Sequence, residues 1–384
     1  MPGLGDTTAM LARLRKSMRT PPSTITETGR SLVETVAFGE SPGALRMLSH
    51  APAGLARKAP LVVVLHGCAQ TAEGYAVSGG WIALAERLGF AVLAPEQMAA
   101  NNPNRCFNWF EPGDTARGRG EAASIAAMVA AAVRAHDCDP RRVFITGLSA
   151  GGAMTAVMLA TYPELFAGGA IIAGLAHGVA RGVPDALRVM GLGDGRGAAA
   201  LGALVQRGGA APLRLAIWQG DADYTVNAAN AQDLVRQWTC ATGLPEAPSE
   251  VARLGNRTRS SWRDAASGSI VELNIVHGLG HGTPLSTKGP DDVGSPAPYM
   301  LEAGLSSTLE IASFWGLGPE GATAAASASD RVAAAPQDRP KPPPAPDAKP
   351  TDLGAQVLDA VSAHVPAQVR DVIAKALRSA GLIP

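Results

Sequence analysis

A single serine among small residues, in the stretch RVFITGLSAGGAM at positions 142–154, constrains the fold more than any other feature of the chain. The apolar, β-branched run before it predicts a buried strand, and the Ala- and Met-rich run after it predicts a helix. Ser149 would then stand where a strand turns sharply into a helix. Large neighbouring side chains would collide on such a turn, and glycines occupy positions 147 and 151. We therefore expect the hydroxyl to lie above a sheet at the positive end of a helix, rather than in a glycine-rich turn that only packs tightly.

Strands and helices alternate along most of the chain. The pattern predicts an opening hairpin at 31–39 and 43–52 and a later one at 258–278. We expect further strands at 59–68, 90–96, 142–146, 167–174 and 213–220, and helices at 81–89, 120–137, 149–166, 226–243 and 299–316. Such alternation implies an α/β fold with a mostly parallel sheet and helices on both faces. With the serine turn, which is the nucleophile elbow of α/β-hydrolases, it predicts an α/β-hydrolase architecture.

Composition divides the chain into four parts. Residues 1–30 form an N-terminal arm with a short predicted helix, and 31–317 hold the catalytic domain. The Pro/Ala-rich range 318–351 predicts an extended linker, and 352–384 regains helical spacing and predicts an amphipathic helical segment. Within the catalytic domain, the glycine-rich range 177–211 predicts either a small cap over the site or a surface loop.

A catalytic serine needs a general base, and the base needs an acid that holds its tautomer. In α/β-hydrolases the acid and then the histidine follow the serine, each after a later strand. After the strand at 213–220 the chain offers Asp221 and Asp223, and we favour Asp223 because it lies further round the loop. After the strand that ends the second hairpin it offers His277 and His281, and we favour His281, which stands between two glycines.

The oxyanion hole of such a site consists of two backbone N–H groups. One is expected from Ala150, which follows the serine, and the other from Cys68 or its neighbour after the strand at 59–68. His66 is expected to brace that loop rather than to act as a second base. No Cys-x-x-Cys or His/Cys cluster indicates a metal, and no cofactor is expected.

Five motifs occur in an order that resembles one family: LHGCAQTAEGY, PEQMAANNPNRCFNWF, DPRRVFITGLSAGGAM, GDADYTVNAAN and GLGHGTP. The chain resembles the poly(3-hydroxybutyrate) depolymerase-type esterases, which are related to feruloyl and acetyl xylan esterases, over about residues 30 to 316. The resemblance implies that Ser149, Asp223 and His281 form the catalytic triad. Many members of the family carry an aromatic residue after the histidine, where this chain has Gly282 and Thr283.

Further expectations concern the loop RCFNWF. Phe107 and Trp109 would either line the mouth of the site, where aromatic rings suit an apolar ester, or belong to the core. Cys68 and Cys106 lie beside family motifs on neighbouring loops, and a disulfide between them is one of two open alternatives.

These observations predict a serine carboxylesterase that acts on short-chain hydroxyalkanoate esters, oligomeric or polymeric. A feruloyl or acetyl xylan esterase is the first alternative. A polymer-granule or partner-binding protein on a hydrolase scaffold is the second. The helices expected in 352–384 are marginal alone in water. This segment is therefore expected to dock on the catalytic domain or self-associate, with contact to a polymer surface and disorder as the alternatives.

The charge balance argues against one class of partner. Lys plus Arg and Asp plus Glu each number 33, so bulk electrostatics do not favour nucleic acid. No apolar run of about 18 residues predicts a transmembrane segment. The first 30 residues lack the continuous apolar stretch of a signal peptide, which favours a cytoplasmic location, with secretion as in many members of the family as the alternative.

Overall fold

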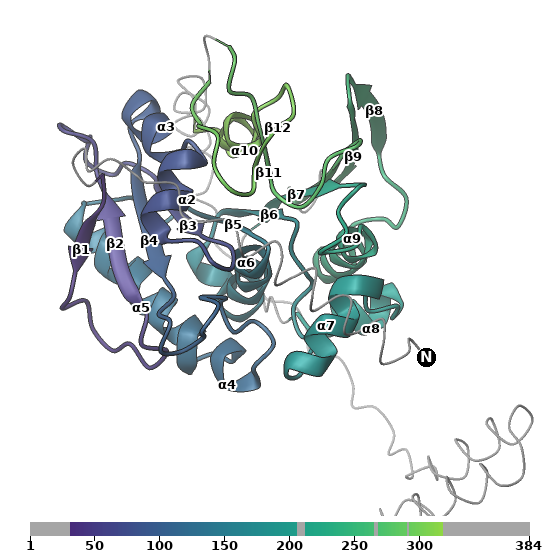
Figure 1. Ribbon diagram of the computed structural model, residues 1–384, viewed down its shortest axis with the longest axis horizontal. Helices are drawn as coiled ribbons and strands as arrows, with labels where there is room; N and C mark the ends of the chain where they lie inside the picture. Colours follow the sequence, from purple (N-terminus) through teal and green to yellow (C-terminus); the bar gives the residue numbers. More distant parts are fainter. Residues whose placement is uncertain (1–30, 206–211, 265–267, 290–291, 318–384) are drawn as a thin grey trace, which may run out of the picture. The chain divides into compact units, whose positions relative to one another are not determined.

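The computed structural model describes residues 31–205, 212–264, 268–289 and 292–317 (Figure 1). Its strands are β1 (Val33–Thr35), β2 (Arg46–His50), β3 (Leu61–Leu65), β4 (Ala91–Glu96), β5 (Val143–Leu148), β6 (Gly168–Ile172), β7 (Arg214–Gly220), β8 (Glu250–Leu254), β9 (Arg257–Arg263), β10 (Ile270–Val276), β11 (Thr283–Leu285) and β12 (Met300–Glu302). Its helices are α2 (Ala72–Ser78), α3 (Trp81–Leu88), α4 (Pro112–Thr115), α5 (Gly120–Ala135), α6 (Ala150–Thr161), α7 (Val183–Leu192), α8 (Ala198–Gly202), α9 (Ala229–Thr242) and α10 (Ser307–Phe314), with a 3₁₀ turn at Pro163–Leu165. The expected N-terminal arm, linker and C-terminal segment lie outside the described residues.

The main sheet has the strand order β1-β2-β4-β3-β5-β6-β7-β10-β9-β8. From β4 to β10 neighbouring strands are parallel, while β1 and β2 on one edge and β9 and β8 on the other pair antiparallel. The two predicted hairpins are therefore present at opposite edges of the sheet. The prediction of a mostly parallel α/β sheet is confirmed.

The parallel strands are buried on both faces, as their continuous apolar sequences require. In β3 all residues are buried, and alternate side chains enter different cores. Leu61, Val63 and Leu65 pack in the cluster that includes residues of α5, α6 and α9. Val62 and Val64 pack in the cluster that includes residues of α2, α3 and α10. Helices thus cover both faces of the sheet, as Figure 1 shows.

The range 299–316, expected to be one helix, divides into two elements. Residues 300–302 form β12, which pairs in parallel with β11, and α10 begins only after Ser306, whose hydroxyl accepts from the N–H of Leu309. Gly304 separates the two with a φ of +65°, a conformation that a continuous helix does not allow. The expectation of a single helix was wrong because this glycine and the serine cap start the helix late.

The range 177–211, expected to be a cap or a loop, contains α7 and α8 in its described part. Both helices contact α9, and the carbonyl of Met190 in α7 accepts from the N–H of Asn227 at 2.8 Å. This arrangement holds the end of α7 beside the loop that follows β7. None of the helices in the described ranges has the length and apolar character that crossing a membrane requires.

Candidate active site

Ser149 lies at a sharp turn between β5 and α6. Its φ of 57° and ψ of −116° are unusual for a residue with a side chain, and its N–H donates to the carbonyl of Ile172 at 2.9 Å. A Cβ atom at position 147 would collide with the backbone of Gly151, and one at position 151 would collide with the carbonyl of Leu65. Only glycine fits at these two positions, which explains the sequence around the serine.

A carboxylate and an imidazole meet across two neighbouring loops. Asp223, after β7, places Oδ2 at 2.7 Å from Nδ1 of His281, after β10. The side chain of Asp223 is fully buried and that of His281 is 11% exposed. The bond assigns the proton to Nδ1, because a carboxylate accepts, and leaves Nε2 of His281 as the free acceptor.

The Asp223 carboxylate is surrounded by N–H donors. Oδ1 accepts from the backbone N–H groups of Thr225 at 2.8 Å and Val226 at 2.9 Å, and Oδ2 also accepts from Nε2 of Gln219 at 3.1 Å. These bonds fix the carboxylate in one orientation, and the orientation in turn fixes the ring of His281.

The remaining two candidates form a second, outer pair. Oδ2 of Asp221 lies 2.8 Å from Nδ1 of His277, and its Oδ1 accepts from the N–H of Gly278 at 2.7 Å. The Thr258 hydroxyl lies 2.8 Å from Nε2 of His277. Contact with His277 and the Gly278 N–H lowers the pKa of Asp221. Both ring nitrogens of His277 therefore already have partners, and the pair ties the two loops together at a more exposed position.

Ser149 and His281 line one small cavity of about 70 Å³. Cys68 and Cys106 form a disulfide, which was one of the two alternatives that the sequence left open. Both cysteines line the cavity. Leu148 at the end of β5 and Met190 in α7 also line the cavity. The remaining lining residues lie in loops: Gly67, Asn104, Thr225 and Tyr299.

The residues of the two expected oxyanion donors are both close to the serine, one through the cavity and one through the chain. Cys68 lines the cavity, and Ala150 begins α6 directly after Ser149. Within the described ranges neither backbone N–H donates to an acceptor. Both groups are thus free to bind an oxygen of a ligand, and the α6 N-terminus adds a favourable field for negative charge.

His66 braces the loop that carries Cys68, as expected. The ring is fully buried, and burial lowers its pKa, so the neutral form is favoured. Nε2 accepts from the N–H of Gln97 at 3.1 Å, so Nδ1 carries the proton and donates to the carbonyl of Gly67 at 2.8 Å. The loop before the cavity is thereby held to the loop that follows β4.

A buried carboxylate, which the sequence did not single out, supports the same loops. Glu121 at the start of α5 accepts from Nε2 of Gln97, and from the N–H and Nδ2 of Asn108 at 2.8 Å each. Gln97 also donates to the carbonyl of Cys106 at 3.0 Å. Burial raises the pKa of Glu121 to about 8. Glu121, Gln97 and Asn108 thus form one hydrogen-bonded cluster, which holds the segment 97–109 to the start of α5.

Phe107 and Trp109 do not line the cavity. Phe107 is fully buried, Trp109 is 7% exposed, and both belong to the core cluster on the α5 and α6 side. Of the two alternatives, the structure therefore contains the core position, and the expectation that these rings line the mouth is corrected. The aromatic ring next to His281 is that of Tyr299, with centroids 6.1 Å apart.

Tyr299 lies against Gly282 and Thr283, the two residues that follow the histidine. A Cβ atom at Gly282 would lie 2.5 Å from the carbonyl of Tyr299, so a larger residue does not fit there. Thr283 is fully buried and its N–H donates to that same carbonyl at 2.8 Å. No local sequence pattern links Tyr299 to the site.

The arrangement is suited to attack on a carbonyl. The Ser149 hydroxyl, on a strained turn, shares a cavity with the His281 imidazole, and a buried carboxylate binds Nδ1 of that ring. Such a set can form an acyl-enzyme with an ester. Within the described ranges no group of three or more His, Cys, Asp or Glu residues is arranged to hold a metal ion.

Comparisons with known proteins agree with this chemistry. The family model of "Esterase PHB depolymerase" matches residues 45–262. The chain is 42% identical over 293 residues to poly(3-hydroxyalkanoate) depolymerase C of Paucimonas lemoignei, covering 75% of this chain and 70% of that protein. It is 30% identical over 267 residues to an acetylxylan esterase of Coprinopsis cinerea, covering 66% of this chain and 70% of that protein.

A solved structure has the same fold. The acetyl xylan esterase from Aspergillus awamori superimposes with a TM-score of 0.63 at 24% identity, covering 75% of this chain and all of that one. The family match spans more than half of the chain, and the depolymerase similarity extends over three quarters of it. The chain therefore belongs to the Esterase PHB depolymerase family of carboxylic ester hydrolases.

Proposed function

We propose that the protein is a serine esterase that hydrolyses short-chain hydroxyalkanoate esters through an acyl-enzyme, with Ser149, His281 and Asp223 as its triad. The observation that carries this proposal is the shared cavity of Ser149 and His281, together with the 2.7 Å bond from His281 to the buried Asp223. Asp221 and His277, the reserve candidates, are occupied with one another and with Thr258.

The reaction follows from these positions. Nε2 of His281 accepts the proton of the Ser149 hydroxyl as its oxygen attacks the ester carbonyl. The N–H groups of Cys68 and Ala150 bind the oxyanion, each contributing on the order of 3 kcal/mol to the transition state. The imidazolium returns its proton to the leaving alcohol, while Asp223 stabilises its charge. Water then attacks the acyl-enzyme by the same route in reverse.

The size and lining of the cavity support a short acyl group. Its volume of about 70 Å³ is far below that of the usual ligand pockets, which span roughly 300 to 1,000 Å³. Leu148, Met190 and the Tyr299 ring give it apolar walls. The similarity at 42% identity to a poly(3-hydroxyalkanoate) depolymerase favours hydroxyalkanoate esters over other short esters.

An acetyl xylan esterase is the second candidate, because an acetyl group fits the same small cavity and relatives of that name are 28–30% identical. A feruloyl group is bulkier and fits the cavity less well. The two candidates are distinguished by measuring hydrolysis of four substrates. These are p-nitrophenyl esters from acetate to octanoate, acetylated xylan, soluble hydroxybutyrate oligomers, and a polyhydroxybutyrate suspension followed by its turbidity.

We expect hydrolysis of the short p-nitrophenyl esters and of the oligomers, and its loss in Ser149→Ala. Ser313→Ala, which changes an exposed serine in α10, is the matched control. A fully active Ser149→Ala protein would sink the proposed mechanism. Release of acetate from xylan without hydrolysis of the oligomers would favour the second candidate.

Contact with an apolar polymer surface is a finer proposal. Three exposed apolar side chains lie on the segments that give Met190 and Thr225 to the cavity: Tyr224 is 89% exposed, Leu192 65% and Val183 53%. These would contact a solid polyester around the cavity. Residues 352–384, outside the described part, remain a proposed site of self-association or polymer contact. Truncation after Leu317 should change adsorption or association state and leave turnover of soluble esters within a few fold.

A further inference from the structure

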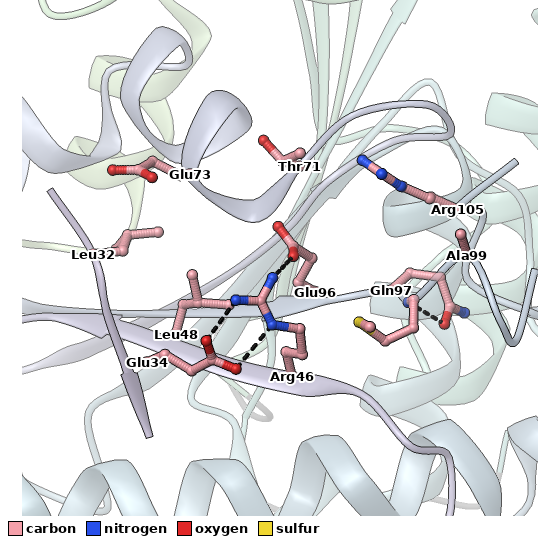
Figure 2. Close-up of a pocket in the computed structure, with 11 residues that line it drawn as sticks. Leu32, Glu34, Arg46, Leu48, Thr71, Glu73, Glu96, Gln97, Ala99 and Arg105 are labelled. Carbon is pink, nitrogen blue, oxygen red and sulfur yellow. Dashed lines mark hydrogen bonds and ion pairs between the residues drawn. The ribbon is translucent and has the colours of Figure 1, made fainter. Parts of the chain in front are cut away.

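A second, larger cavity of about 380 Å³ lies at the end of β4, beyond the loop that carries Cys68 (Figure 2). Most of its charges are already paired. Figure 2 shows the Arg46 guanidinium between two carboxylates, with bonds to Glu34 at 2.5 and 2.8 Å and to Glu96 at 2.5 Å. The second oxygen of Glu96 accepts from the N–H of Ala72 at 2.9 Å. The charged groups in this part of the wall therefore already have partners within the protein.

Two hydrogen-bond donors in the cavity remain available. The Arg105 side chain makes no hydrogen bond or ion pair with any residue that the structure describes. The Thr71 hydroxyl oxygen accepts from the N–H of Gly74 at 3.1 Å, which leaves its O–H free to donate. In Figure 2 the Arg105 guanidinium points toward Thr71 across the upper part of the cavity. Arg105 and Thr71 thus bring a guanidinium and a hydroxyl to the same cavity.

The backbone of Arg105 has an uncommon conformation and is hydrogen-bonded. Its φ is 51°, and its N–H donates to the carbonyl of Asn102 at 2.8 Å. On one side the Asn104 carbonyl accepts from the N–H of Ala69 at 2.7 Å, and on the other Cys106 is tied to Cys68. A left-handed conformation in a residue with a long side chain persists where the surroundings impose it, commonly at ligand sites.

Three consecutive residues are divided between the two cavities. Asn104 and Cys106 line the small cavity with Ser149, and Arg105, between them in the chain, lines the large one. Arg105 thus adjoins in the chain two residues of the small cavity and brings a guanidinium to the large one. In an oligomeric hydroxyalkanoate the free carboxylate belongs to the alcohol that leaves when an ester bond is cut. That carboxylate is the anionic group nearest to a scissile ester at the chain end.

We propose that Arg105 and Thr71 form a subsite for the free carboxylate of hydroxyalkanoate oligomers, on the leaving-group side of the ester. The guanidinium supplies a charge-assisted, two-pronged contact and the Thr71 hydroxyl a further donor. Glu73, whose Oε1 accepts from the N–H of Ser31 at 2.7 Å, repels an anion from the far end of the cavity and confines it to the Arg105 end. The inference rests on the proposed esterase function and adds selectivity for chain ends.

The test compares the (R)-3-hydroxybutyrate trimer as free acid with its methyl ester, which lacks only the charge. For the wild-type protein we expect a higher kcat/KM with the acid. Arg105→Gln should lower the acid-to-ester ratio of kcat/KM about 10-fold, as the loss of a charge-assisted contact predicts. Arg105→Lys should give an intermediate ratio, because a lysine contacts a carboxylate through one nitrogen. Raising the salt concentration should lower the wild-type ratio.

Arg253→Gln, an exposed arginine on β8, is the matched control and should keep the wild-type ratio. An unchanged ratio in Arg105→Gln would overturn the subsite. Binding provides a readout that needs no turnover: calorimetric titration of Ser149→Ala with the trimer acid should show Kd about 10-fold weaker when Arg105→Gln is added. Equal binding by both proteins would overturn the inference. A wild-type protein that binds the acid through Arg105 but hydrolyses no ester would instead refute the proposed function.

Discussion

His281 donates from Nδ1 to Oδ2 of Asp223 over 2.7 Å, whereas His277 has partners on both ring nitrogens. We therefore expect His281→Ala to lower kcat on p-nitrophenyl butyrate by about 10⁴- to 10⁶-fold, as loss of a triad base does. His277→Ala should stay within about 10-fold, because it loosens the two loops without removing a proton acceptor. The reverse order of the two variants would show that the base is His277.

The two aspartates should differ in the same way. Asp223→Asn leaves the shape of the buried site but replaces an acceptor with an amide and disturbs the His281 tautomer, so kcat should fall by about 10⁴-fold. Asp221→Asn weakens an exposed contact with His277, which contributes on the order of 1 kcal/mol or less. The check is kcat on one soluble ester, beside circular dichroism to show that both variants fold. Comparable losses would mean that the outer pair takes part in the reaction.

The disulfide between Cys68 and Cys106 closes a loop with a sequence separation of 38 and borders the cavity. Replacing both cysteines with serine should lower the free energy of unfolding by about 4 kcal/mol on the chain-entropy account. It should also lower kcat/KM, because the Cys68 N–H and the segment 104–106 lose their mutual anchor. Cys240→Ser, which changes an exposed free thiol, is the control. Full activity in the double variant would show that the bridge does not position the oxyanion loop.

The serine turn could be predicted because all of its determinants are contiguous. The strand, the glycines that avoid collisions and the helix occupy thirteen consecutive positions, 142–154, and the geometry of Ser149 follows from local sterics. The alternating strands and helices likewise follow from short-range periodicity. Gly304, in contrast, stands within a helical pattern, and only the structure shows that this glycine and the Ser306 cap separate β12 from α10.

The walls of the site depend on contacts between distant segments. Asp221 and Asp223 follow the same strand, and only the fold reveals that each binds a different histidine. Met190 and Tyr299 come from segments without a recognisable motif. Glu121 joins Gln97 and Asn108, which lie 24 and 13 positions away in the chain. The triad roles stay predictions until the variants are measured.

The buried Glu121 should make stability depend on pH. Burial raises the pKa of Glu121 to about 8, whereas its pKa in the unfolded chain is the ordinary value near 4.5. Between these two pH values the folded protein keeps the proton and the unfolded chain has released it. In this window the free energy of unfolding falls as pH rises, by up to about 1.4 kcal/mol per pH unit, and the loss ends above pH 8. Asp114, which is hydrogen-bonded to the N–H of Glu121, has a raised pKa and adds in the same direction.

Buried histidines work in the opposite direction at lower pH. Burial lowers the pKa of His66 and His177 below the ordinary value of about 6.5. Below pH 6.5 the unfolded chain therefore binds protons that the folded protein does not. The free energy of unfolding consequently rises as pH increases toward about 6.5. The measurement is therefore the difference between wild type and Glu121→Gln in urea unfolding at pH 6.5, 7, 7.5 and 8. The amide is neutral throughout, so wild type should lose stability relative to the variant across this range. A constant difference between the two proteins would mean that Glu121 is already ionised at pH 6.5, and that the N–H donors of Gln97 and Asn108 outweigh its burial.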